Sequence, residues 1–486
     1  MSDRANRAWG VVALGFVLVA MAIVRTTSYE GSVGDAGLMA LGVGLFVAVQ
    51  AVLVMFRADT VTRIIYGYLA TFYFGNRALS EVWLGPATEL GAGTVAPLLL
   101  GDVIVLEAAL RRRILAPAWL FLFAALTLLP AAGLLLDHGA SAGQSVSGPH
   151  LGSFVYQYLV LVRAAVVAVV LVRFLKRSGR GVHGYLTHLG VIFAVLGCMT
   201  ALIAVVTGER FGLPGWGVNV YANALAVVGA LCGWRAIHRP GRRWLDIVLL
   251  LGCAAGIVGS GTRLALLALV GVVLWTLLAT LFARRWPVFG HLSVGIAVGV
   301  IVVGFGGTLI ALAGEVNPRF ATIGGIEVTP DLGPSEVLDA IQRESSVRTR
   351  LTLWGSSLEM FTASPVVGVG WGQWNWVKAE YGATFAALLD PHNGYLWALS
   401  EGGVIGLVAV YGTLVGLLVV LSPTLPSFGV LLALVLESSN ANLQKPLFAV
   451  LIAVLLALAW QARRLARGER PTVTQRTSGA TRPGPS

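Results

Sequence analysis

The stretch SSVRTRLTLWGSSLEMFTASPVVGVGWGQWNWVKAEYGATFAALLDPHNGYLWALSEGGVIGL, residues 345–407, divides two kinds of sequence in this chain. As far as Pro391 it carries arginines, a Ser-Pro-x-x-Gly-x-Gly turn and clustered tryptophans, a mixture that cannot lie exposed in the lipid interior. From His392 onward it runs into apolar sequence. We therefore expect most of this stretch to lie outside a membrane, on a scaffold formed by the apolar sequence around it.

The composition of the chain indicates a membrane protein. Hydrophobic residues make up 57% of the 486 residues, and charged residues only 12%, whereas soluble proteins carry about 25% charged residues. Apolar runs of about 17–25 residues, enough to span a bilayer as a helix, recur along the chain. These runs are continuous rather than alternating, which excludes a transmembrane barrel. The sequence predicts an all-α polytopic membrane protein.

Fourteen apolar runs are predicted to be helices, or about twelve if the third and the thirteenth cross the membrane only partly. The first run lacks a small-residue cleavage site, so we interpret it as a retained helix and not as a signal peptide. The predicted ranges are 8–25, 36–56, 61–79, 94–110, 115–136, 153–175, 184–207, 216–236, 243–259, 262–283, 288–313, 393–421, 425–438 and 446–462.

The formal net charge of +11 is better explained by membrane topology than by nucleic-acid binding. If the N-terminus is cytoplasmic, the arginine- and lysine-rich loops fall on the cytoplasmic side at every crossing, as the positive-inside rule requires. The opposite loops contain only Arg210 and Lys445. They span residues 80–93, 137–152, 208–215 and 439–445. Both termini are therefore predicted to be cytoplasmic.

This orientation places the longest loop, residues 314–391, on the outer face. Loops of this length are usually functional or disordered, and its many aromatic residues argue against disorder. The segment LTLWGSSLEMF has helical spacing, which predicts an interfacial helix along the membrane surface. The tail after Gly468 is rich in Arg, Thr, Pro and Gly, and we expect it to be disordered and cytoplasmic.

Several polar residues are candidates for a site, each with a simpler structural explanation. Arg263 lies at the outer end of a predicted helix, where it either faces a cavity or an anion or extends to the interface. Arg348 and Arg350 precede the interfacial helix and, taken alone, are most simply solvated loop charges. His392 opens the next helix, whose positive N-terminal dipole favours a neutral ring that can accept a proton. A structural histidine at an interface is still the commoner case.

Other patterns exclude some chemistry. The glycines of SPVVGVGWG do not follow a predicted strand, so they favour a sharp turn that brings the backbone close to a ligand over a dinucleotide site. The outer loops have no Asp-x-Asp, no His-Glu-x-x-His and no carboxylate cluster, which argues against a metal site. The chain has no P-loop lysine motif. We therefore expect no metal and no cofactor.

Arg163 and Glu437 are predicted to face the bundle interior, and Glu437 is a candidate partner of Lys445 or Arg163.

Three fragments in this order resemble the O-antigen ligase and polymerase family. They are GSGTRLALLALVG, the R-x-x-x-W of Arg350 and Trp354 with SPVVGVG downstream, and PHNGYLWALSEGGVIGL. The resemblance covers about residues 245–460, and the N-terminal half is similar only in hydropathy. It implies a division into N-terminal transmembrane helices, a ligase-like membrane domain and a cytoplasmic tail. These parts are residues 1–244, 245–465 and 466–486.

The resemblance implies a metal-independent, inverting glycosyltransferase with a GT-C-related fold in the bacterial inner (cytoplasmic) membrane. Such an enzyme takes a glycan from undecaprenyl diphosphate on the periplasmic face and transfers it to a hydroxyl of an acceptor glycan or lipid. By this resemblance, Arg263 and Arg350 bind the diphosphate and His392 is the catalytic base. Arg348 fits the motif spacing less well and is kept as a second diphosphate-binding candidate. Whether the enzyme is a ligase or a polymerase stays open.

The physical chemistry of the residues agrees with these roles. Arginines neutralise a diphosphate leaving group by paired hydrogen bonds, and a neutral histidine suits the removal of a hydroxyl proton. Aromatic rings stack on sugars, so a further set of residues is expected to contact the glycan. It comprises Trp354, Trp371, Trp374 and Asn393. The alternative function is a transporter or flippase of a lipid-linked saccharide or a small anion.

Overall fold

The structure, a computed structural model, is dominated by helices in the part of the chain that it describes. That part comprises residues 46–69, 100–112, 151–176, 178, 181–208, 210–211, 217–282, 322–323, 326–327, 345–383 and 390–469. Five of its helices are long and apolar enough to cross a membrane. Strands are limited there to a two-residue antiparallel pair, β1 (Thr322–Ile323) with β2 (Ile326–Glu327). The prediction of an all-α polytopic membrane protein is confirmed.

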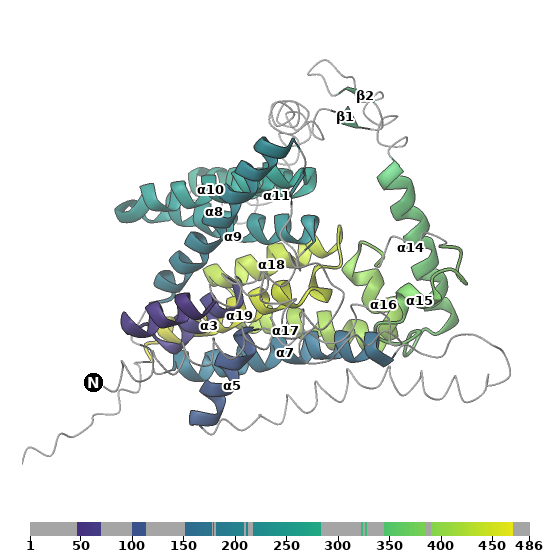
Figure 1. Cartoon of the computed structure of the whole chain (residues 1–486), viewed down its shortest axis with the longest axis horizontal. Coiled ribbons are helices and arrows are strands. Elements are labelled where there is room, and N and C mark those ends of the chain that lie inside the picture. Colours follow the sequence, from purple (N-terminus) through teal and green to yellow (C-terminus); the bar gives the residue numbers. More distant parts are fainter. Residues whose placement is uncertain are drawn as a thin grey trace, which may run out of the picture.

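Four consecutive helices form one layer, seen in teal at the upper left of Figure 1. Small residues let two of them approach closely: a Cβ on Gly197 would lie 2.2 Å from the carbonyl oxygen of Gly252. Gly256, one turn further on, meets Gly197 in the same way. This contact of small residues is typical of membrane helices, where close packing replaces the hydrophobic driving force. The layer comprises α8 (Val182–Thr207), α9 (Val218–His238), α10 (Arg243–Ser260) and α11 (Arg263–Phe282).

The C-terminal helix α19 (Pro446–Ala466) is the centre of the bundle. Every side chain from Leu447 to Ala459 is buried, which explains why the helix is apolar on all sides. It packs against α7 (Leu151–Leu175) and α18 (Leu425–Glu437). The helices α3 (Thr60–Leu69) and α5 (Leu100–Arg112) lie near the same core and pack on each other.

One membrane-spanning run, residues 394–421, is broken rather than continuous. It consists of α16 (Gly394–Leu407), a π-helical turn η3 (Val408–Gly412) and α17 (Thr413–Leu421). At Gly403 the backbone has φ 59° and ψ −160°, a conformation that is open almost only to glycine. The amide groups of Val404 and Ile405 bond to the carbonyls of Pro365 and Val366 instead of to their own helix. The sequence correctly predicted the extent of this helix and missed the break.

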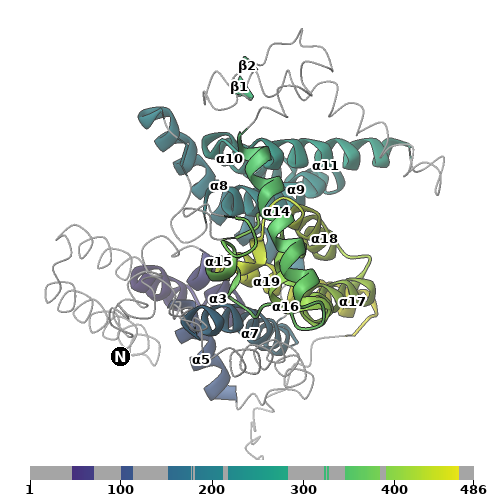
Figure 2. The ribbon, with the colours of Figure 1, turned by 90° about the vertical axis from the view of Figure 1, so that its right-hand side faces the viewer.

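The loop before α16 carries two described helices, α14 (Ser345–Ala363) and α15 (Trp374–Val377). α14 packs along α16 at one side of the molecule, as the two orthogonal views show (Figures 1 and 2). The expected helix in this loop is therefore present. The contact between α14 and α16 holds this loop against the helix that follows it.

Segments that the charge pattern assigned to the same side of the membrane do meet. At one end, the hydroxyl of Tyr185 at the start of α8 donates to Asp59 before α3 (2.8 Å). There, Lys176 at the end of α7 lies over the ring of Trp460 near the end of α19 (5.3 Å). The alternation of the crossings thus agrees with the contacts. The cytoplasmic position of this end stays a prediction.

The expected helices agree with the observed ones where both can be compared. The runs predicted at 153–175, 184–207, 216–236, 243–259, 262–283, 425–438 and 446–462 correspond to α7, α8, α9, α10, α11, α18 and α19. Other predicted segments lie wholly or partly outside the described residues. They are the helices 8–25, 36–56, 61–79, 94–110, 115–136 and 288–313, much of the loop 314–391, and the tail beyond Glu469.

Candidate functional site

The segment Asp390–Asn393 leads into α16 with an unusual backbone. Asn393 is the N-cap: its Oδ1 accepts hydrogen bonds from the amides of Tyr395 (3.0 Å) and Leu396 (3.1 Å), which satisfies the first free N–H groups of the helix. His392, just before it, has φ 51°, a left-handed conformation that is uncommon for a residue with a side chain. Its amide is held by Oδ1 of Asp390 (2.9 Å). Strain of this kind persists where surrounding contacts enforce it.

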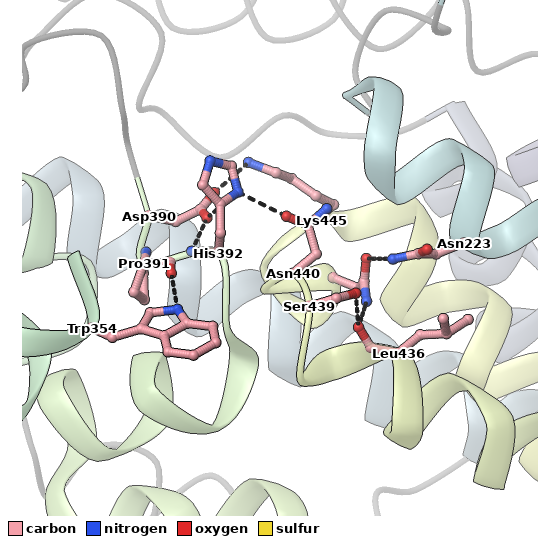
Figure 3. A network of polar contacts seen from close by, with 10 residues as sticks. Asn223, Trp354, Asp390, Pro391, His392, Leu436, Ser439, Asn440 and Lys445 are labelled. Carbon is pink, nitrogen blue, oxygen red and sulfur yellow. Dashed lines mark hydrogen bonds and ion pairs between the residues drawn. The ribbon is translucent and has the colours of Figure 1, made fainter. Parts of the chain in front are cut away.

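The ring of His392 lies in a polar cluster between the segment before α16 and the loop after α18 (Figure 3). Its Nδ1 is 2.8 Å from Oδ1 of Asn440 and 3.4 Å from Oδ1 of Asp390. The other carboxylate oxygen of Asp390 is 3.8 Å from Nζ of Lys445. The His392 side chain is 24% exposed, so it remains accessible from outside the protein. We call His392, Asp390, Asn440 and Lys445 the mouth cluster.

A second cation acts on the same carboxylate. Lys378 follows α15, is buried, and donates from Nζ to Oδ1 of Asn375 (2.7 Å). Burial lowers the pKa of Lys378, and the negative charge of Asp390 acts in the opposite direction. Asp390 therefore lies in the field of two lysines as well as next to the histidine. Among the described residues, no group of three or more His, Cys, Asp or Glu is placed to hold a metal ion.

Helix α14 is attached to this segment through Trp354. Its indole Nε1 donates to the carbonyl of Pro391 (3.0 Å), one residue before His392. Arg350 precedes Trp354 by one helical turn, so both lie on the same face of α14, and Arg350 is half-buried. This explains the R-x-x-x-W spacing: the tryptophan fixes the helix to the histidine segment, and the arginine lies one turn away. The side chain of Arg348 lies outside the described part of the chain.

Arg263 belongs to the same end of the bundle. It is the first residue of α11 and is half-buried. The hydroxyl of the preceding Thr262 lies 3.4 Å from Oδ1 of Asn219 in the first turn of α9. Asn223, one turn along α9, donates to Oδ1 of Asn442 (2.9 Å), in the loop that also carries Asn440. The two contacts, both made by the first turns of α9, place the start of α11 and the loop that carries Asn440 at the same end of this helix.

The loop that carries Asn440 and Lys445 is fixed from below by Glu437. The carboxylate of this residue accepts from the amide of Leu443 (3.0 Å) and from the hydroxyl of Tyr411 (2.8 Å). The suggested pairing of Glu437 with Lys445 or Arg163 is wrong. Lys445 faces Asp390, and Arg163 bonds instead to Asp102, at 3.0 and 3.1 Å from its two oxygens. Glu437 is thus a structural support for the loop.

The glycine-rich turn packs against the protein's own helix α16. Gly368, with φ 69°, has no space for a side chain because a Cβ there would lie 2.4 Å from the backbone of Glu401. The buried carboxylate of Glu401 accepts from the amides of Gly372 (2.9 Å) and Trp374 (3.0 Å), and from the indole of Trp397. Glu401 therefore holds the turn against the broken helix α16, which corrects the expectation of a ligand-binding turn.

Two of the expected glycan-contacting tryptophans need correction. Trp371 is 0% and Trp374 is 1% exposed, so neither ring has a face on which a sugar could stack in this structure. Trp371 packs on Trp397 (centroids 5.0 Å apart) over a surface left open by glycines of α16. Trp374 donates to the hydroxyl of Ser357 in α14 (2.9 Å). Trp354 is half-buried and retains exposed surface, and Asn393 has a capping role that the sequence did not predict.

The part of the chain that carries most of this geometry matches a known family. Residues 247–411 match the family model described as O-Antigen ligase, and they include Arg263, Arg350, Trp354 and His392. This part of the chain is therefore similar to an O-antigen ligase domain. The match covers about a third of the chain. No curated protein matches the chain.

The residues that match the family model include only part of the mouth cluster. Asp390 and His392 lie within the matched residues, whereas Asn440 and Lys445 follow them in the chain. From the sequence, Lys445 was expected only as a basic residue of the loop 439–445 and as a candidate partner of Glu437, and Asp390 and Asn440 were not predicted. The concentration of asparagines in SSNANLQK, residues 438–445, was the one available signal.

Proposed function

We propose that this protein transfers a glycan from undecaprenyl diphosphate to an acceptor hydroxyl on the outer face of the bacterial inner membrane. The observation that carries the proposal is the placement of His392. Its ring is partly exposed at the mouth of a membrane-embedded bundle, and the ring is held through Nδ1 alone among its described contacts. A group in this position can take a proton from a sugar hydroxyl that approaches from outside the membrane.

The reaction is an inverting displacement at the anomeric carbon. The acceptor oxygen attacks this carbon, its proton passes to Nε2 of His392, and the bond to the lipid diphosphate breaks with its electron pair on the leaving oxygen. Arg350 and Arg263 lie at the same end of the bundle as His392, where their guanidinium groups would bind the developing negative charge. Trp354 has the exposed surface required to stack on a sugar.

Two arginines neutralise a diphosphate without a metal ion, so the transfer is metal-independent, and Arg348 in the first turn of α14 is a secondary candidate for the same role. The helices form a GT-C-related scaffold, and both termini are cytoplasmic. The acceptor is a glycan or a lipid. Product length distinguishes a ligase, which adds one glycan, from a polymerase, which adds many.

A test uses purified protein in liposomes that contain undecaprenyl-diphosphate-linked glycan. We expect release of undecaprenyl diphosphate on addition of acceptor glycan, with no loss of activity in EDTA. We expect no release by the His392→Ala and Arg350→Ala variants. If every acceptor gives no release, and both variants remain fully active in cells, the proposal is wrong. Loss of activity in EDTA that Mg²⁺ or Mn²⁺ restores would refute the metal-independent mechanism alone.

Transport of a lipid-linked saccharide or a small anion is the second candidate function. The observation in its favour is an ionisable pair within predicted transmembrane helices, Arg163 in α7 with Asp102 in α5. Asp102 also accepts from the hydroxyl of Tyr68 (2.6 Å), and this network explains the burial of the arginine without a transported ion. Movement of labelled saccharide or anion across the liposome membrane without bond cleavage would favour transport.

A further inference from the structure

The two oxygens next to Nδ1 of His392 determine where the ring carries its hydrogen. A neutral imidazole has one donor nitrogen and one acceptor nitrogen. Oδ1 of Asn440 lies 2.8 Å from Nδ1, and Oδ1 of Asp390 lies 3.4 Å from it. The carboxylate of Asp390 can only accept, so it favours a hydrogen on Nδ1 whichever way the amide of Asn440 is turned. The lone pair is then on Nε2, on the side of the ring that faces away from Asn440 (Figure 3).

Asn440 is well placed to hold this arrangement because its loop is tightly fixed. Asn440 is 4% exposed. Two residues later, Asn442 donates to the carbonyl of Leu436 (3.2 Å) and accepts from Asn223 of α9 (2.9 Å). Glu437 binds the next amide of the loop, that of Leu443. The loop is therefore anchored to α9 and α18, and Asn440 meets His392 as part of a rigid unit.

We propose that Asn440 is a positioning residue: its side-chain oxygen holds His392 in the tautomer with hydrogen on Nδ1, so that Nε2 is the proton acceptor. This inference rests on the proposed function. Asp390 and Asn440 have different roles. Asp390 accepts from the backbone amide of His392 and so fixes its strained backbone, whereas Asn440 makes the shorter contact to the ring. A base that must be aligned on one nitrogen needs its other nitrogen fixed in this way.

The arrangement also accommodates the product of proton transfer. When Nε2 takes the acceptor proton, the ring becomes a cation that still donates from Nδ1 to Asn440. Oδ1 of Asp390 lies 3.4 Å from the same Nδ1, and its other oxygen lies 3.8 Å from Nζ of Lys445. A neutral partner at position 440 supports the ring in both states without trapping the proton. This explains the choice of an amide rather than a carboxylate at the shorter contact.

The test is a comparison of steady-state transfer by the full-length protein and by three variants in liposomes. Asn440→Ala removes the oxygen, Asn440→Asp keeps an oxygen and adds charge, and Ser439→Ala is the control. Ser439 bonds to the carbonyl of Leu436 from the same loop (2.8 Å). We expect Asn440→Ala to lower kcat about tenfold with KM unchanged, as the loss of one orienting hydrogen bond predicts. The Ser439→Ala variant should match the unmodified protein.

The pH profile separates positioning from simple structural support. In Asn440→Asp, a second carboxylate beside the ring stabilises the imidazolium, so the acidic limb of the kcat/KM profile should move to higher pH. A normal kcat for Asn440→Ala, or an unshifted profile for Asn440→Asp, would overturn the inference. His392→Ala keeps the two proposals apart. If it is inactive while Asn440→Ala is normal, only the positioning role fails, and if it is fully active, the base itself is wrongly assigned.

Discussion

The two ends of the helix bundle hold polar clusters of opposite character. At one end, Arg235 and Asp246 form an ion pair of 2.8 Å whose side chains are 1% and 0% exposed. At the other end, His392, Asp390 and Lys445 are separated by 3.4 and 3.8 Å and are 24%, 11% and 28% exposed. The first cluster neutralises its own charges and excludes solvent. The second keeps longer contacts and accessible groups, which are the properties of a binding site.

The backbone shows the same contrast. Arg235 and Asp246 lie within the regular helices α9 and α10. His392 has a positive φ, and the helix that follows it is broken at Gly403. Backbone strain concentrates at functional sites, where the surrounding structure enforces it. This contrast supports the proposal that His392 carries the chemistry, and it predicts that the Arg235–Asp246 pair serves stability.

We call the end of the bundle with His392 the open end and the end with Arg235 and Asp246 the closed end. The largest effect is expected for His392→Ala at the open end. General base catalysis contributes roughly 10²–10⁴-fold, so transfer should fall by about this factor. The side chain is accessible and lies outside the packed core, so the melting temperature in detergent should change little. Measured release of lipid diphosphate, with a melting curve on the same sample, checks both. A large drop in melting temperature would show that His392 is structural and would remove the contrast between the ends.

The closed end should give the reverse result. Asp246→Ala leaves the guanidinium of Arg235 buried without its partner, which costs about 3–5 kcal/mol. The unfolding midpoint in a denaturing detergent should fall accordingly, and transfer per folded molecule should not change. The double variant Arg235→Leu with Asp246→Leu is the matched control, because removal of both charges is often nearly neutral. A double variant as unstable as the single one would contradict this explanation.

The sequence predicted the scaffold well because helix length and loop charge are local properties. The helices α7 to α11, α18 and α19 lie where hydropathy placed them. The spacing of Arg350 and Trp354 is also local, and its physical reason is visible as the bond from Trp354 to Pro391. Features that depend on one helical turn or on one apolar run could therefore be predicted from the sequence.

The parts that the sequence missed depend on contacts between distant segments. Asn440 meets His392 across 48 positions of the chain, and no pattern within the loop 439–445 indicates this partner. The predicted glycan contacts of Trp371 and Trp374 were wrong for a related reason. The sequence does not distinguish an aromatic residue that faces solvent from one that is buried, as Trp371 is against glycines of α16. Glu401 and Gly403 sit in an apolar run, and only the structure shows that the run is broken there.

A substitution at Gly403, where the helix is broken, should destabilise the protein more than a substitution at another glycine of residues 394–421. A Cβ at position 403 would lie 2.4 Å from the backbone of Val366, and the residue has φ 59°. Gly403→Ala should therefore destabilise the protein by at least about 1–3 kcal/mol from backbone strain. It should also lower the rate of transfer, because the glycine-rich turn would no longer pack closely against α16. Gly416→Ala is the control, since no described atom lies within 4 Å of a Cβ there. Equal melting temperatures for both variants would contradict a role for the break.

The smallest effect concerns the link between α14 and the mouth cluster. Trp354→Phe keeps a ring that can stack on a sugar and removes the hydrogen bond to Pro391. Such a bond contributes about 1 kcal/mol, so we expect about a fivefold loss in kcat. If Trp354 acts mainly by stacking, KM for the glycan should rise instead and kcat should persist. Leu358→Ala is the control, because Leu358 is exposed on the same helix. A fall in kcat alone would show that α14 acts on the reaction by positioning His392.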